Sequence, residues 1–140
     1  MLNINEYLNK IDDINYALTK IDVPYNPKNF PIEYAMGKDL DIFVSSEHFE
    51  IIKKKTNEYF NKYTQFQFKI IKTKNNFRLR MEENDKLHFQ IDITIDNLLI
   101  LDRVKKKNYY ILSLENEKKV RLLEVKNHPN KIHHKKWLKY

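Results

Sequence analysis

The sequence of 140 residues has no cysteine and only one glycine, Gly37. Disulfide frameworks and cysteine-ligated zinc are therefore excluded, as is a glycine-rich phosphate loop. No apolar run approaches the roughly 20 residues that span a bilayer, and the N-terminal residues lack the basic and apolar stretches of a signal peptide. We expect a soluble, cytoplasmic protein that makes no membrane contact.

The composition is that of a folded chain, with 41% hydrophobic and 13% aromatic residues. Segments too polar to bury apolar surface stay disordered, and this chain is not of that kind. Its length suits one domain, since domains usually run to roughly 100–200 residues. We predict a single domain over 1–140 with a basic helical C-terminal segment at about 114–140.

Positive charge is concentrated near the C-terminus. Residues 1–102 carry 14 Lys and Arg against 16 Asp and Glu, whereas residues 103–140 carry 12 against 3, a local net charge of +9. Such a basic segment favours an anionic partner such as nucleic acid, a nucleotide or an acidic protein. The alternative interpretation is a lysine-rich helix whose charges are merely solvated.

The apolar pattern predicts an α+β domain. Helical spacing predicts a first helix over 2–20, and three prolines predict a loop over 23–31. Period-two alternation predicts half-covered strands. The expected strands are 39–44, 66–70, 77–81, 87–96 and a short one at 108–112. Ser45 or Ser46, and later Ser113, are suited to cap helices, and Pro129 interrupts the last one. We expect a mixed or antiparallel sheet with helices packed on one face.

Two aspartates open the first of these strands. Residues i and i+2 of a strand point to the same side, so Asp39 and Asp41 project together, while Leu40 and Ile42 face the core. At an effective dielectric near 20, two such charges about 5 Å apart repel by roughly 3 kcal/mol. A divalent cation would remove this repulsion, and oxygen ligands of this kind suit Mg²⁺ or Mn²⁺.

A third carboxylate is expected from the strand at 87–96. Asp92 and Asp96 share one face of that strand, with isoleucines on the other. If the strand lies beside the Asp39 strand, Asp92 completes a three-carboxylate cluster. We prefer Asp92 to Asp96 because core residues flank it on both sides and would hold it rigidly.

The segments GKDLDIFV at 37–44 and FQIDI at 89–93 resemble the polymerase β-type nucleotidyltransferase superfamily. Its signature is an acidic pair on one strand and a third carboxylate on a neighbouring strand. The resemblance covers roughly residues 10–126. It implies that Asp39, Asp41 and Asp92 hold two Mg²⁺ or Mn²⁺ ions, and that a nucleoside monophosphate passes from a nucleoside triphosphate to an acceptor hydroxyl. Other enzymes with two-metal sites use the same chemistry, an in-line displacement at phosphorus between two cations.

The sequence departs from this family in one respect. Members usually carry a Gly-Ser pair before the acidic pair, where it grips the triphosphate, and no Gly-Ser occurs here. Thr19, Lys20 and Lys38 are the available substitutes. The departure leaves open an inactive, nucleotidyltransferase-like binding module.

Arg78 and Arg80 share one face of the strand at 77–81. If that is the carboxylate face, their guanidinium groups suit a phosphate or pyrophosphate, and we predict nucleotide or phosphate binding at Lys38, Arg78 and Arg80. The alternative is that the arginines pair with Asp92 or surface acids.

Three of the five histidines fall within the C-terminal run at 126–140. His-rich tracts can bind metal, but Pro129 separates His128 from the other two, and neighbouring helical residues point apart. Lysines around Trp137 are typical both of a helix docked through its tryptophan and of a nucleic-acid surface that stacks a base.

The leading function is a metal-dependent nucleotidyltransferase whose acceptor is an RNA end, a protein hydroxyl, a small molecule or a glycan precursor. A homodimer or a partner chain would then supply the acceptor surface. The alternatives are the inactive binding module and a nucleic-acid-binding domain that uses the basic C-terminus.

Overall fold

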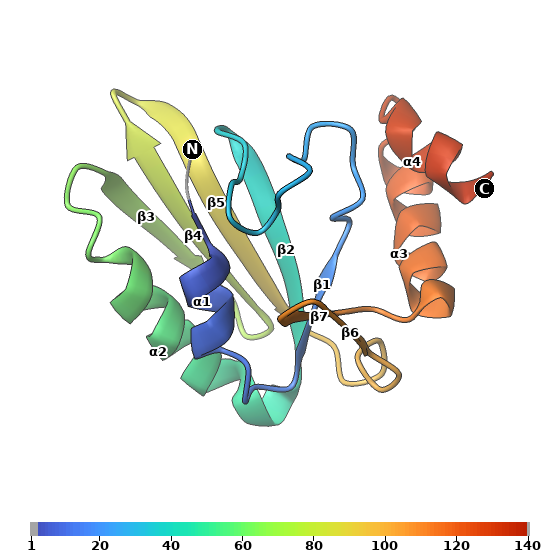
Figure 1. Ribbon diagram of the computed structural model, residues 1–140, viewed down its shortest axis with the longest axis horizontal. Coiled ribbons are helices and arrows are strands. Elements are labelled where there is room, and N and C mark those ends of the chain that lie inside the picture. The colour runs from blue at the N-terminus through green and yellow to red at the C-terminus, as the bar shows by residue number, and fades with distance from the viewer. Residues whose placement is uncertain (1–2, 140) are drawn as a thin grey trace.

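The computed structural model describes residues 3–139 and contains, within them, four α-helices, a short 3-10 helix and one seven-stranded sheet (Figure 1). In chain order the elements are α1 Asn5–Lys10, β1 Tyr16–Thr19, β2 Lys38–Val44, η1 Ser46–His48, α2 Phe49–Phe60, β3 Gln67–Lys72, β4 Asn76–Glu83, β5 Lys86–Ile95, β6 Val104–Lys106, β7 Tyr109–Ile111, α3 Leu114–Asn127 and α4 Ile132–Leu138.

The sheet is mixed, with the strand order β3-β4-β5-β2-β1-β7-β6. Strand β5 runs parallel to β2, and β7 runs parallel to β1. The other neighbouring pairs are antiparallel. The predicted α+β class is confirmed, and of the two sheet types expected, mixed or antiparallel, the sheet is the mixed one.

The main core lies between the sheet and helices α1 and α2, which cover one of its faces (Figure 1). Alternate residues of the central strands point into it, among them Leu40, Ile42, Ile91 and Ile93. The alternation follows from the pleat, which sends successive side chains to opposite faces. The odd-numbered residues of β2 and the even-numbered residues of β5 are therefore left on the other face.

Helix α3 packs on that other face, at the β1 side of the sheet. Val120 of α3 lies in a second apolar cluster with Ala17 of β1, Ile100 and Leu112. Phe43, the register partner of Ala17, packs against the same cluster. The predicted packing of helices on one face thus holds for α1 and α2, whereas α3 covers one end of the opposite face.

The predicted helix over 2–20 is wrong beyond α1, and Leu2 lies outside the described residues. Helix α1 ends at Lys10, and Tyr16–Thr19 form β1, a strand whose four residues are all buried. Strand β1 is hydrogen-bonded between β2 and β7. These pairings with distant strands override the local helical spacing.

The predicted helix caps and the predicted break at Pro129 are confirmed. The Ser45 hydroxyl accepts the His48 N–H at the start of η1, and the Ser113 hydroxyl accepts the Asn116 N–H at the start of α3. Helices α3 and α4 lie on either side of Pro129. Among residues 3–139, no helix is long and apolar enough to cross a membrane.

Candidate active site

The parallel pairing of β2 and β5 brings the three predicted carboxylates to one face of the sheet. Asp41 is the direct register partner of Asp92, and Asp39 is the partner of Gln90. Paired residues of neighbouring strands share a face, as do residues i and i+2 of one strand. Asp39, Asp41 and Asp92 therefore lie together, on the face opposite α1 and α2.

Lys20 forms an ion pair with Asp41. Its Nζ lies 3.0 Å from Asp41 Oδ2 and 2.8 Å from Glu124 Oε1, so one ammonium group bridges β2 and α3. Both side chains of the Lys20–Asp41 pair are largely buried, with 17% and 25% of their surface exposed.

The backbone at Lys20 is strained, with φ at +56°, a region that residues other than glycine rarely adopt. Glu117 of α3 stabilises this conformation by accepting the Lys20 N–H, at 3.2 Å from Oε2, and the Thr19 hydroxyl, at 2.8 Å from Oε1. Thr19 and Lys20, two of the three residues suggested in place of Gly-Ser, are thus held by α3.

Burial and charge perturb the acidic groups of this face. Burial raises the pKa of Asp41 despite the opposing effect of Lys20, and desolvation and the charge of Asp92 raise the pKa of Asp39. Burial alone would raise the pKa of Glu124, but the hydrogen bond and charge of Lys20, together with the charges of Lys131 and His134, outweigh it and lower that pKa to about 2. Glu124 is thus the more firmly ionised partner of Lys20.

Asp92 is bound by groups from β4. Arg78 Nη2 lies 2.9 Å from Asp92 Oδ2, and the Asn76 side-chain amide donates to Oδ1 at 2.6 Å. Arg80 lies on the same face and donates to Gln90 Oε1 at 3.1 Å. Of the two interpretations of the arginines, the structure thus shows pairing with neighbouring polar groups, and phosphate binding by them stays a prediction.

Asp96 lies apart from the cluster. Its Oδ1 accepts the N–H groups of Leu98 and Leu99 in the turn that follows β5. Its carboxylate is therefore used to order that turn.

A cavity of about 390 Å³ opens beside the carboxylates, between β2, the loop before it, α3 and α4. It is lined by four acids and three lysines, with Tyr25, Gly37 and two histidines completing the wall. The acids are Asp39, Asp41, Asp92 and Glu124, and the lysines are Lys20, Lys38 and Lys131. Lys38, predicted to bind phosphate, lines this cavity.

Three carboxylates share one face of the sheet, and carboxylate oxygens are the type of ligand that a hard divalent cation prefers. In the part of the chain that the structure describes, however, no three or more His, Cys, Asp or Glu side chains are grouped as a metal site. Asp41 is turned to Lys20, and Asp92 to Arg78 and Asn76. A cation would have to displace these partners.

Sequence reasoning missed the contribution of α3 to the site. Glu117 and Glu124 are seven residues apart, two helical turns, and so reach Lys20 from one face of α3. Arg121 lies between them, on the same face, and donates to Glu117 at 2.8 Å. Glu117, Arg121 and Glu124 do follow helical spacing in the sequence. Such a polar pattern is not detected when only apolar residues are used to identify the faces of a helix.

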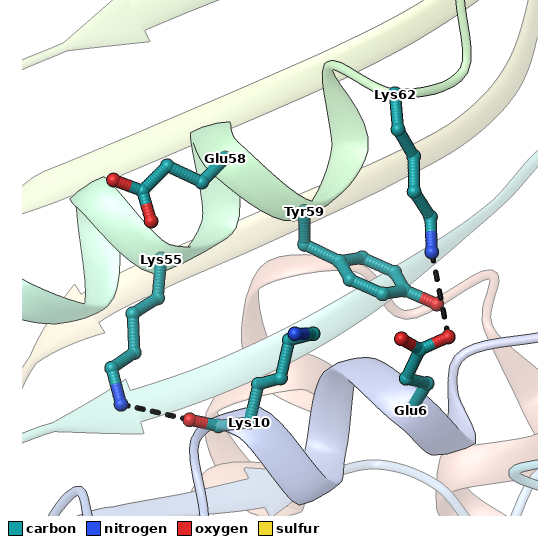
Figure 2. A pocket seen from close by; sticks show the side chains of 6 residues that line it. All are labelled: Glu6, Lys10, Lys55, Glu58, Tyr59 and Lys62. Carbon is teal, nitrogen blue, oxygen red and sulfur yellow. Dashed lines mark hydrogen bonds and ion pairs between the residues drawn. The ribbon is translucent and has the colours of Figure 1, made fainter.

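A second hollow of about 350 Å³ lies on the other side of the molecule, between α1 and α2 (Figure 2). Lys55 Nζ donates to the Lys10 carbonyl at 2.9 Å, and Lys62 Nζ lies 3.5 Å from Glu6 Oε2. Lys55 also pairs with Asp13, at 3.2 Å, and Glu58 pairs with Lys54, at 4.0 Å, so most of the charged groups that line this hollow have partners within the chain.

No family model and no curated protein matches this sequence. The fold is similar to part of the crystal structure of the Megavirus polyadenylate synthase, with a TM-score of 0.51 and 12% sequence identity. The match covers 96% of this chain and 30% of that one, so the chain spans less than a third of the enzyme it resembles. At this identity the likeness concerns the fold alone: the chain shares its α+β architecture with part of that synthase.

Proposed function

We propose that the chain is a metal-dependent nucleotidyltransferase that transfers a nucleoside monophosphate from a nucleoside triphosphate to an acceptor hydroxyl, with release of pyrophosphate. The observation that carries the proposal is the side-by-side placement of Asp41 and Asp92 on parallel strands, with Asp39 two residues away on the same face. The fold likeness to a polyadenylate synthase supports the same class of chemistry.

In this proposal Asp39, Asp41 and Asp92 hold Mg²⁺ or Mn²⁺. The bound cation would neutralise charge on the phosphates and lower the pKa of an acceptor hydroxyl. As the resemblance implies, Asp92 would accept the acceptor's proton, once it is released from Arg78 and Asn76. Lys38 would bind phosphate oxygens, because it lines the cavity beside Asp39 and Asp41, whereas the ammonium group of Lys20 is held by Asp41 and Glu124.

A second candidate is the inactive binding module. The ion pairs of Asp41 with Lys20 and of Asp92 with Arg78 favour it, because they neutralise two of the three carboxylates without any metal. The missing Gly-Ser pair points the same way.

Calorimetric titration with ATP, GTP, CTP and UTP, each with and without Mn²⁺, tests the proposal. We expect one nucleotide to bind only with Mn²⁺, and the Asp39→Asn variant to lose that binding. Asp39→Asn is the preferred variant because it leaves the Lys20–Asp41 ion pair in place.

If Mn²⁺ binds but no triphosphate does, the binding module replaces the enzyme. If the chain binds neither Mn²⁺ nor a triphosphate, both candidates fail. The remaining hypothesis is then a nucleic-acid-binding domain that uses the basic C-terminus, and titration with a nucleic acid tests it. Such binding would weaken steeply with added salt and would not change in Asp39→Asn.

A further inference from the structure

The wall of the cavity formed by α4 is fixed to the domain by a buried arginine. Arg121 of α3 is 1% exposed, and its guanidinium group lies 4.5 Å from the centre of the Trp137 ring of α4. Its Nη1 lies 3.2 Å from Nδ1 of His134, and its Nε is paired with Glu117. These contacts of Arg121 therefore hold α4 in place as one wall of the cavity.

Two aromatic rings meet at the edge of this cavity. Tyr25, from the loop between β1 and β2, packs edge-on against His133 of α4, with ring centroids 6.2 Å apart. The ammonium group of Lys38 lies 4.5 Å from the centre of the Tyr25 ring. Tyr25 is 38% exposed, so part of its ring is free to contact a ligand. Burial, followed by the charge of Arg121, lowers the pKa of His133, which favours the uncharged ring.

The charges of the cavity are close to balance. Lys131 lines it from the start of α4, with Nζ 3.5 Å from Glu124 Oε2, and joins Lys20 and Lys38 against four carboxylates. A triphosphate would thus meet three ammonium groups, but it would need an additional cation to offset the acids. Arg78 and Arg80 are not among the residues that line the cavity.

We propose that this cavity is the nucleotide site, with the base against Tyr25 and His133 and the phosphates on Lys38 and Lys131. The inference rests on the proposed function and deepens it. The volume of about 390 Å³ lies within the range of small-molecule sites, and aromatic rings stack nucleobases without sequence preference. The β4 side of the carboxylates, with Arg78 and Arg80, is then left for the acceptor. Of the predicted phosphate ligands this keeps Lys38 of β2, and Lys131 beside α4 takes the place of the two arginines.

The test uses two probes, ATP and inorganic tripolyphosphate, titrated in the presence of Mn²⁺ into the wild type and four single variants. Tyr25→Ala removes the proposed base contact, and Lys131→Met removes a proposed phosphate contact. Arg80→Met tests the rival phosphate side. Lys135→Met is the matched control, because Lys135 is exposed on the same helix and lies outside the cavity.

We expect Tyr25→Ala to weaken ATP binding about tenfold and to leave tripolyphosphate binding unchanged, since only ATP has a base to stack. Lys131→Met should weaken both probes severalfold, with Lys135→Met and Arg80→Met within about twofold of the wild type. Saturation-transfer NMR on ATP, with diamagnetic Mg²⁺ in place of Mn²⁺, should show loss of the base-proton signals in Tyr25→Ala. Circular dichroism of each variant confirms that the fold is retained.

The outcomes separate this inference from the proposed function. If the wild type binds ATP with Mn²⁺ but Arg80→Met loses it while Tyr25→Ala and Lys131→Met do not, the nucleotide lies on the β4 side. The inference is then wrong and the proposed function stands. If the wild type binds neither ATP nor another triphosphate, the proposed function fails and this inference fails with it.

Discussion

Lys20 and Lys131 pair with different oxygens of the Glu124 carboxylate. Lys20 bridges Asp41 and Glu124, whereas Lys131 reaches only the second oxygen of Glu124, at 3.5 Å. Glu124 thus links the carboxylates of the sheet to the wall formed by α4.

The first prediction concerns the third carboxylate. Asp92→Asn should lower Mn²⁺ affinity at least tenfold, because it removes a charged ligand from the proposed cluster. Asp96→Asn is the matched control: its amide oxygen can still accept the turn N–H groups, and we expect wild-type affinity. Calorimetric titration with Mn²⁺ measures both, and the reverse pattern would make Asp96 the ligand.

The second prediction concerns Lys20, which pairs with both Asp41 and Glu124. Lys20→Met leaves Asp41 and Glu124 without their shared cation. We expect the free energy of unfolding without metal to fall by about 2 kcal/mol. Removing the lysine from this largely buried pair leaves the carboxylate charges uncompensated. The affinity for Mn²⁺ should rise, since the lysine no longer competes for Asp41.

Urea unfolding with and without Mn²⁺ measures both effects of Lys20→Met. Lys105→Met removes an ion pair between half-exposed residues, with Asp12, and should change stability by less than about 1 kcal/mol. Equal losses in the two variants would contradict the role assigned to Lys20.

The third prediction is a pH dependence. Burial, reinforced by the charges of His133 and Arg121, lowers the pKa of His134 from 6.5 to about 4. Because the folded state disfavours the protonated ring, its contribution to stability is complete above pH 6.5 and is lost as the pH falls toward 4. His134→Gln should therefore reduce the slope of stability against pH between 6.5 and 5.

Thermal unfolding across that range measures the effect. The control is His128→Gln, which changes a histidine that is exposed beyond the end of α3. The interpretation is wrong if the two variants keep the same slope as the wild type.

The fourth prediction concerns the attachment of α4. Arg121→Met removes the contacts to Glu117, His134 and Trp137 and leaves Glu117 without its guanidinium partner. We expect a loss of about 2–4 kcal/mol in the free energy of unfolding and faster tryptic cleavage in the linker between α3 and α4. Lys119→Met, an exposed position on the same helix, should leave both unchanged. A wild-type rate of cleavage in Arg121→Met would show that other contacts hold α4.

Local sequence patterns determined a large part of this protein. Alternation of apolar and polar residues located β2, β4 and β5, and it also put Asp39 and Asp41 on one face, because the pleat has a period of two. Ser45 and Ser113 marked helix starts, because an N-cap is a local hydrogen bond. The catalytic and metal-binding roles of these aspartates, the single domain and the cytoplasmic location stay predictions.

Only the tertiary structure decided which groups meet across the chain. Tyr16–Thr19 form a strand because β2 and β7 lie on either side, although their spacing also fits a helix. Lys20 contacts Glu124, which is 104 residues away, and Arg78 contacts Asp92 because β4 and β5 are paired in that register. Local periodicity determines which side of an element a residue faces, whereas its neighbour there depends on strand order and helix docking, which depend on the packing of the whole core.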